Sequence, residues 1–378
     1  MDVALGRVGS ARERPFRHID PMLIAVSFGL AVIGLFMVYS STRATQAAFH
    51  LDPTLYVKKQ LAWLVLATVV LLVAIAFDYR YTKVYAGFIY AGLLLLLLLV
   101  RTPLGSTVKG AQRSFQVFGF AFSPSEAMKV GLVIMLAAFL SERKGGTLSL
   151  TDLWRATFLG AIPMALVFIQ PDIGTTIVLV AIMVGVLIVA GARTRHLALL
   201  AIVAAGLIAA SFQLGIIKSY QISRITGFLD QESSSSAHYN AEQSQIAIGA
   251  GGLTGRGYLK GLQTNLDYVP EQHTDFIFTA VGEEFGFAGA VGMLVLFAIL
   301  LWRAFRIALL SKDAYGTYLA AGIVSMFAIQ MFVNIGMTVG IMPITGIPLP
   351  FVSYGGSSLL ANFAAIGLLM NVHMRRFK

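Results

Sequence analysis

The sequence predicts an all-α polytopic membrane protein with about ten transmembrane helices. Hydrophobic residues make up 57% of the 378 residues and charged residues only 12%, and the mean hydropathy is +0.79. So few polar side chains could not cover a water-soluble particle of this size, which excludes the soluble enzyme classes. The chain contains no Cys, which also excludes disulfides, thiolate metal sites and cysteine nucleophiles.

Ten apolar stretches approach the length of about 20 residues that crosses a bilayer. In chain order they cover about residues 21–40, 60–77, 84–100, 124–140, 153–170, 173–191, 197–217, 276–301, 318–341 and 358–373. We therefore expect one membrane domain at 21–373, short tails at 1–20 and 374–378, and one large hydrophilic loop at 218–275. The apolar link at 342–358 contains three Pro and three Gly. Such a segment cannot continue a helix, so it predicts a re-entrant or surface hairpin.

Lys and Arg are distributed unevenly between the two ends of the predicted spans. An even number of spans places both tails on one side, and with both tails inside, the inner segments hold most of the 28 Lys and Arg. Basic residues gather at cytoplasmic membrane edges. We therefore expect cytoplasmic termini and an extracytoplasmic loop at 218–275. This distribution explains the net charge of +10 through contact with membrane lipids, so we predict no binding of nucleic acid.

Polar groups at the outer ends of the spans mark candidate sites, because such groups are costly in a membrane. Glu126 follows Ser123 and Pro124 as in a capping box, so it could simply cap its helix. Lys129 lies one turn deeper on the same face and needs Glu126 or an anionic ligand as a partner. We expect a functional role for Lys129 and leave Glu126 open between a cap and a site residue.

Further acids lie where loops turn into spans. Asp172 precedes the span at 173–191 and could cap it. Asp275 follows Glu271 and His273, and its carboxylate suits proton abstraction from a hydroxyl group. His273 and Asp275 could instead hold a divalent ion. Ser353, in the proline hairpin, could donate to a ligand, although a scaffold role for the hairpin is favoured.

A glycine-rich segment and two deeper acids have structural readings as well. Residues 249–257 resemble a phosphate-binding loop in composition, but they lack the Gly-Lys-Ser/Thr ending and precede no soluble strand–helix unit. No nucleotide site is predicted. Glu283 and Glu284 lie deeper in the eighth span, near the small packing residues Gly282 and Gly286. They are either structural or the beginning of a polar path.

The candidate residues share one predicted region. Arg113, Lys129, Glu126, Asp172 and Asp275 all lie at outer helix ends or in the loops that feed them. Cations suit a diphosphate headgroup, and a carboxylate suits a hydroxyl group that must lose its proton. The set fits transfer from a lipid-linked donor, and equally a transporter that binds such a lipid.

Six motifs in a fixed order carry a family resemblance. They are Gly110-Ala111-Gln112-Arg113, Pro124-Ser125-Glu126 with Lys129, Gln170 to Thr175, Pro270 to Phe278, Glu283 to Gly286 and Pro348 to Ser358. Together they resemble the SEDS family over about residues 20–375. Within that family, residues 243–249 and 251–253 resemble the elongation branch, RodA, rather than the division branch, FtsW.

The resemblance implies a peptidoglycan glycosyltransferase of the bacterial inner membrane. It implies that lipid II units are joined at the outer leaflet during cell elongation, that undecaprenyl diphosphate is released, and that a class B penicillin-binding protein, a transpeptidase, is the partner. The family's essential acid falls on Asp275, as the base that deprotonates the acceptor 4-hydroxyl. Arg113 and Lys129 would neutralise the leaving diphosphate, Glu126 would place Lys129, and Asp172 would order the cavity.

Some points stay open beside this resemblance. Glu271, His273 and Ser353 are expected among the substrate-binding residues, and the family allows a divalent cation, Mg or Mn, on the diphosphate. Ser114 and Ser123 replace the Trp and Gln that members usually carry, so the loop at 101–122 could hold substrate differently. The alternatives to an enzyme are a lipid II flippase and a non-catalytic scaffold for the penicillin-binding protein.

Overall fold

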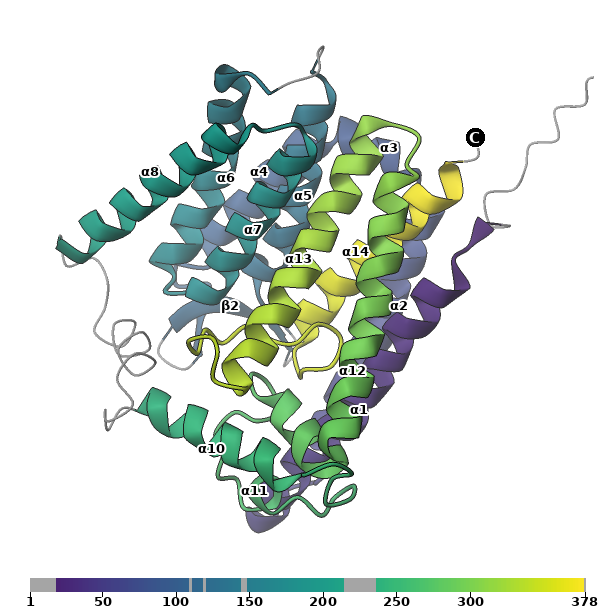
Figure 1. The fold of residues 1–378 in the computed structure, drawn as a ribbon, viewed down its shortest axis with the longest axis vertical. Coiled ribbons are helices and arrows are strands. Elements are labelled where there is room, and N and C mark those ends of the chain that lie inside the picture. Colours follow the sequence, from purple (N-terminus) through teal and green to yellow (C-terminus); the bar gives the residue numbers. More distant parts are fainter. Residues whose placement is uncertain (1–17, 109–110, 118–119, 144–147, 214–235, 377–378) are drawn as a thin grey trace, which may run out of the picture.

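The chain folds into a bundle of long helices with a small sheet at one end (Figure 1). The structure is a computed structural model that describes residues 18–108, 111–117, 120–143, 148–213 and 236–376. Most of the predicted tail at 1–20 lies outside these residues, whereas residues 374–376 are described and α14 extends to Arg375.

Ten long apolar helices coincide with the ten predicted spans. They are α1 (Pro21–Ala48), α2 (Leu55–Ala76), α4 (Ala86–Leu99), α5 (Pro124–Ser141), α6 (Leu150–Ile169), α7 (Ile173–Val189), α8 (Thr194–Gln213), α12 (Ile277–Leu309), α13 (Ala314–Thr338) and α14 (Gly356–Arg375). Seven of them are long and apolar enough to cross a membrane, whereas α4, α7 and the described part of α8 are shorter. The chain is therefore an all-α polytopic membrane protein, as predicted. A short helix, α3 (Tyr79–Val84), precedes α4.

The helices begin where polar side chains can bind free backbone N–H groups. Asp20 accepts hydrogen bonds from the N–H groups of Met22 and Leu23 at the start of α1, and Asp313 accepts one from Gly316 at the start of α13. Such caps satisfy donors that have no partner within the helix.

Helices α5, α13 and α14 form the interior of the bundle. Their most apolar windows are 72%, 61% and 83% buried, against 22% for α12, whose remaining surface is left for lipid. Glycines allow the close approach of these helices. A Cβ at Gly322 of α13 would lie 2.8 Å from Val133 of α5, and one at Gly367 of α14 would lie 2.5 Å from Ala74 of α2.

Both described ends of the chain lie at the same end of the bundle. Arg303 of α12 binds the carboxylate of Asp20, and the Asp20 N–H contacts the sulfur of Met370. Figure 1 shows this end at the top, opposite the short helices α10 (Ser236–Ala250) and α11 (Leu262–Asn265). We call the lower end, where α5, α7 and α14 begin, the cavity end.

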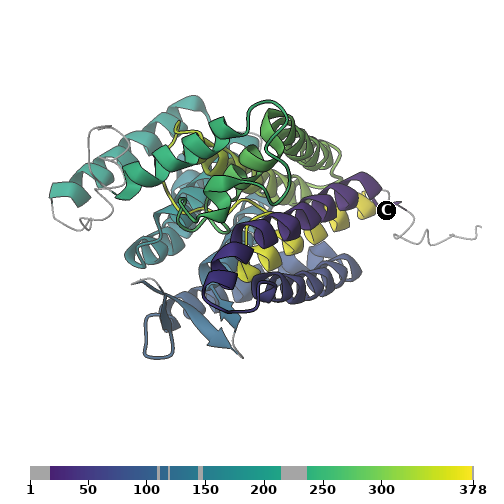
Figure 2. The same ribbon diagram turned by 90° about the horizontal axis from the view of Figure 1, so that it is seen from below.

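The segment at 101–122, expected to be a loop, contains a three-stranded antiparallel sheet. Strand β2 (Ala111–Val117) pairs with β1 (Ser106–Val108) and with β3 (Phe120–Phe122). Figure 2 shows the sheet projecting from the edge of the helical bundle. The Ser123 N–H donates to the Ser357 hydroxyl, which donates to the Ala121 carbonyl, so the sheet is tied to the start of α14. Strands β1 and β3 are too short to give an alternating pattern, and the polar run at 112–114 interrupts the alternation in β2.

The glycine-rich segment at 249–257 supports a break in helix α12. The helix is interrupted at Gly286, which has φ 64° and ψ −160°. The carbonyls of Glu283 and Glu284 accept from the N–H groups of Arg256 and Gly257, and the N–H groups of Phe287 and Ala288 donate to Gly252 and Leu253. A backbone pairing thus replaces the helix hydrogen bonds that are lost at the break.

The link between α13 and α14, residues 339–355, has no regular secondary structure, as its prolines and glycines predict. Ile347, Leu349, Phe351 and Val352 are at most 2% exposed. The hairpin therefore lies within the protein. A Cβ at Gly174 would lie 2.9 Å from the Thr345 carbonyl, so the hairpin rests directly on the first turn of α7.

Replacing Gly255 by Ala should destabilise the fold. Gly255 has φ +80°, and a Cβ there would lie 2.1 Å from the carbonyl oxygen of Glu284. The added Cβ would force the backbone of residues 252–257 and of α12 apart. We therefore expect the free energy of unfolding to fall by about 2 kcal/mol or more. The measurement is thermal unfolding of the purified protein in detergent. Gly249→Ala is the matched control, because nothing lies within 4 Å of that position, and equal stability of the two variants would contradict the pairing.

Candidate active site

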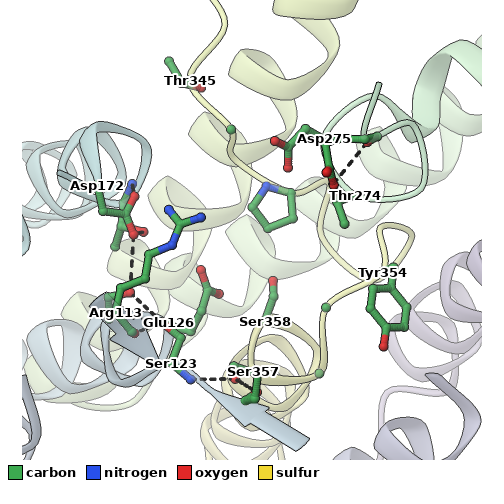
Figure 3. A pocket seen from close by; sticks show the side chains of 18 of the residues that line it. Arg113, Ser123, Glu126, Asp172, Thr274, Asp275, Thr345, Tyr354, Ser357 and Ser358 are labelled. Carbon is green, nitrogen blue, oxygen red and sulfur yellow. Dashed lines mark hydrogen bonds between the residues drawn. The ribbon is translucent and has the colours of Figure 1, made fainter. Parts of the chain in front are cut away.

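A cavity of about 1010 Å³ opens at the cavity end of the bundle. Its wall is built from α2, the sheet, the starts of α5, α7 and α14, the segment before α12, and the proline hairpin. Five predicted site residues line it, namely Arg113, Glu126, Asp172, Glu271 and Asp275. Figure 3 shows that residues from distant parts of the chain converge there.

Arg113 and Asp172 form one side of the cavity. Arg113 extends from β2, and its guanidinium group points into the cavity near Asp172 (Figure 3). The Asp172 carboxylate accepts from the Thr175 N–H at 3.0 Å and from the Thr175 hydroxyl at 2.9 Å. Asp172 therefore caps α7, as one reading of the sequence predicted, and lines the cavity as well.

Glu126 and Lys129 form a buried ion pair behind this side. The Lys129 ammonium lies 2.7 Å from the Glu126 carboxylate, and the two side chains are 1% and 12% exposed. The capping-box interpretation is wrong, because Ser123 makes no side-chain cap and its hydroxyl donates to the Arg113 carbonyl instead. Glu126 lines the cavity and Lys129 lies beneath it. The ammonium has the carboxylate partner that a buried charge requires.

Asp275 lies two residues before α12, with its carboxylate directed into the cavity (Figure 3). Phe276 is the N-cap residue of α12. The backbone of Asp275 is held by Asn334 of α13, whose amide donates to the carbonyls of Asp275 at 2.8 Å and Ile347 at 2.7 Å. Asn334 is fully buried and joins the acid to the proline hairpin.

The three remaining predicted residues lie in different settings. Glu271 lines the cavity and accepts, at its carbonyl, from the Thr274 N–H. The His273 ring packs against the rings of Tyr56 and Tyr354, with centroids 4.9 and 5.7 Å away. Ser353 is buried, and its hydroxyl accepts from the Leu349 N–H, which stabilises the hairpin. Its neighbours in the same motif, Ser357 and Ser358, line the cavity.

Glu283 and Glu284 serve the fold around the break in α12. The Glu283 carboxylate accepts from the N–H groups of Gln263 and Thr264 and from the Thr264 hydroxyl, which fixes the start of α11. Glu284 accepts from Ser40 of α1. Glu283 therefore joins α12 to α11, and Glu284 joins α12 to α1.

The described side chains do not assemble a metal site by themselves. Within the described part of the chain, no three His, Cys, Asp or Glu residues converge closely enough to hold an ion. His273 is engaged in ring contacts with two tyrosines. Since a protein-held divalent cation takes several oxygen or nitrogen ligands, we assign no step to a metal.

Several cavity residues have no distinctive sequence signal. Tyr56 and Lys59 of α2, Asn240 of α10 and Tyr354 of the hairpin line the wall. Asn334, which lies behind the cavity wall, does carry a signal, because an amide within an apolar span is costly and marks a specific partner. Burial raises the pKa of Tyr354 above its ordinary value, so its hydroxyl stays neutral and can donate.

A helical membrane bundle with carboxylates and cations around one cavity at the end of its helices is the architecture of a membrane protein with a site for a polar, charged ligand. The chain belongs to the FtsW/RodA/SpoVE family, the SEDS family, whose family model, described as "Cell cycle protein", matches residues 20–378.

Relatives and a solved structure agree with this assignment. The chain is 38% identical over 363 residues to stage V sporulation protein E of Bacillus subtilis, covering 93% of this chain and 96% of that protein. It is 33% identical over 360 residues to the peptidoglycan glycosyltransferase MrdB of Escherichia coli K12, with 95% and 94% covered. A solved structure described as "Structural coordination of polymerization and crosslinking by a peptidoglycan synthase complex" superposes with a TM-score of 0.80 at 29% identity, covering 95% of this chain and 99% of that one.

Replacing Glu126 by Gln should destabilise the protein by leaving a buried ammonium without its carboxylate. We expect a loss of about 3 kcal/mol or more, measured by thermal unfolding in detergent. The double variant Glu126→Gln/Lys129→Met should recover most of this loss, because it removes the buried charge as well. Unchanged stability in the single variant would show that Lys129 does not depend on Glu126.

Proposed function

We propose that Asp275 is the general base with which this protein joins lipid II units into glycan strands. The protein is a peptidoglycan glycosyltransferase, in line with the activity named for its relative MrdB. The observation that carries the mechanism is the placement of Asp275 and Arg113 on the wall of one cavity. A base and a cation for the leaving group are the two groups that the transfer needs.

In the proposed reaction, the Asp275 carboxylate takes the proton of the acceptor 4-hydroxyl. The resulting oxygen forms a bond to the anomeric carbon of the donor sugar, and the bond between that carbon and the diphosphate breaks. Undecaprenyl diphosphate leaves with its negative charge next to Arg113. Asn334 keeps the base in position through the Asp275 carbonyl, to which its amide donates at 2.8 Å.

Lys129 acts through Glu126 in this mechanism. Its ammonium is 1% exposed and Glu126 lies between it and the cavity. Arg113 lines the same side of the cavity as Glu126 and Asp172 and is therefore the cation that contacts the diphosphate, while Lys129 fixes the Glu126 carboxylate next to it. Asp172 orders the wall through Thr175 and the start of α7.

We propose further that the cavity end faces outward from the bacterial inner membrane and that both termini are cytoplasmic. The excess of Lys and Arg in the predicted inner segments and the position of both described chain ends opposite the cavity support this orientation. The substrate would then enter from the outer leaflet. A class B penicillin-binding protein is the proposed partner, because the similar solved structure couples polymerization to crosslinking.

Asp275→Asn should abolish glycan polymerisation without changing stability. The amide keeps the shape of the side chain but cannot accept the proton, and removal of a general base costs about 10²–10⁴-fold in rate. The measurement is polymer formed from lipid II by the purified protein together with its partner. The control is Asp267→Asn. Asp267 lies, like Asp275, between α11 and α12, and its φ of 56° is a conformation that Asn tolerates.

Three measurements separate the enzyme from the flippase and the scaffold. Wild-type polymer yield from Asp275→Asn would remove the base assignment. Absence of polymer with the wild-type protein, combined with movement of lipid II across vesicle membranes, would favour the flippase. A scaffold would be favoured if Asp275→Ala and Lys129→Ala both preserved cell shape.

A further inference from the structure

Aromatic side chains line the side of the cavity formed by α2 and the proline hairpin. Tyr56 and Trp63 lie on α2, and Tyr354 lies in the hairpin. Their spacing along α2, with Lys59 between them, corresponds to one helix face. Figure 3 shows Tyr354 on one side of the cavity, Arg113 and Asp172 on the other, and Asp275 between the two sides. We call Tyr56, Trp63 and Tyr354 the aromatic wall.

The aromatic wall is fixed by hydrogen bonds to the backbone around Tyr354. The Tyr354 N–H donates to the His273 carbonyl at 2.9 Å. The Gln60 amide donates to the Ser353 carbonyl at 3.2 Å and accepts from the Gly355 N–H at 3.3 Å. Three successive residues of the hairpin are thus held, so the position of the Tyr354 ring does not depend on a ligand.

The rings themselves are also in contact. The Tyr56 and Tyr354 rings meet edge to face at a centroid distance of 5.1 Å. Trp63 lies against Gly356, where a Cβ would be only 2.0 Å from the indole ring. Tyr56 and Tyr354 nevertheless remain partly exposed. A rigid, partly exposed aromatic surface costs little conformational entropy when it binds a ligand.

The chemistry of this side selects the kind of ligand. An isoprenoid chain would bury apolar surface, but Lys59 and the tyrosine hydroxyls would then lose their solvation. A pyranose ring has an apolar face of C–H bonds and a rim of hydroxyl groups. Its face packs on the negative face of an aromatic ring, and its hydroxyls bind groups such as the Lys59 ammonium and the tyrosine hydroxyls.

We propose that the aromatic wall is a carbohydrate-binding subsite that holds the sugar chain on the side of Asp275 away from Arg113. The inference rests on the proposed function in its choice of a glycan as the ligand. It gives the cavity a direction, with the diphosphate at Arg113, the sugar rings at Tyr354, and the base between them. Ring stacking supplies the affinity and the tyrosine hydroxyls add little.

The first test measures sugar binding without turnover. Trp154 and Trp302 are 44% and 54% exposed on lipid-facing surfaces, so Trp154→Phe/Trp302→Phe leaves Trp63 as the single tryptophan reporter. We expect chitotetraose, a β-1,4-linked tetramer of N-acetylglucosamine, to change Trp63 emission saturably. Tyr354→Leu should weaken this binding about fivefold, since a stacked ring contributes about 1 kcal/mol.

Two controls separate the ring from other effects. Tyr354→Phe keeps the ring and should bind chitotetraose within about twofold of the parent. Tyr268 lies between α11 and α12, and its side chain is 46% exposed. Tyr268→Leu should have no effect on chitotetraose binding. The proposal is overturned by an unsaturable response to chitotetraose, by unchanged binding in Tyr354→Leu, or by an equal loss in Tyr354→Phe. A saturable response to farnesyl diphosphate, undiminished by chitotetraose and weakened by Tyr354→Leu, would assign the wall to lipid and overturn it as well.

The second test links the subsite to turnover. In the polymerisation assay, Tyr354→Leu should raise KM for lipid II about fivefold and leave kcat within about twofold, because ring stacking is uniform binding. A lower kcat with unchanged KM would overturn the subsite. Asp275→Asn should bind chitotetraose normally while forming no polymer. If Asp275 is not the base, the chitotetraose binding result still stands. If the aromatic wall is not a sugar subsite, the loss of polymer in Asp275→Asn still stands.

Discussion

The architecture depends on the need of every buried backbone N–H and C=O group for a hydrogen-bond partner inside a membrane protein. Two segments leave regular helix within the bundle, and each finds partners in a different way. At the break in α12, residues 252–257 pair with the backbone around Gly286. In the hairpin before α14, Asn334 and Gln60 bind backbone groups with their side chains. Both solutions bear on the cavity, since one fixes the helix that follows Asp275 and the other fixes the wall beside it.

The electrostatics of the cavity follow from what lies behind its surface. Glu126 would add negative charge beside a diphosphate, but Lys129 lies 2.7 Å behind it. The Asp172 carboxylate accepts two hydrogen bonds from Thr175, which hold it at the start of α7. Arg113 therefore lies on a side of the cavity where the carboxylate of Glu126 is paired and that of Asp172 is held in place. Because the pair at Glu126 and Lys129 is buried, solvent ions screen it less than they screen surface charges.

The sequence predicts the bundle well and the non-helical parts poorly. All ten apolar helices coincide with predicted spans, because span length and hydropathy are strong signals over about 20 residues. The sheet at 106–122 was missed, since β1 and β3 have only three residues each and the polar run at 112–114 interrupts the alternation of β2. The capping box at Ser123 was wrong because the sheet, formed by distant pairing, engages that hydroxyl. Asp172, in contrast, was readable as a cap because its partner lies three residues away. Tyr56 and Tyr354 come together only through the fold, so their meeting could not be predicted from local pattern.

The break at Gly286 divides α12 into two mechanically separate parts. The short part that follows Asp275, residues 277–285, is secured by the bonds of Glu283 to α11 and by the pairing with residues 252–257. The long part beyond Gly286 has a largely exposed, apolar surface. Bilayers of different thickness change the tilt of such helices. A joint between the two parts lets the long part adjust to its bilayer while the carboxylate keeps its place, so the site is insulated from the membrane that surrounds it.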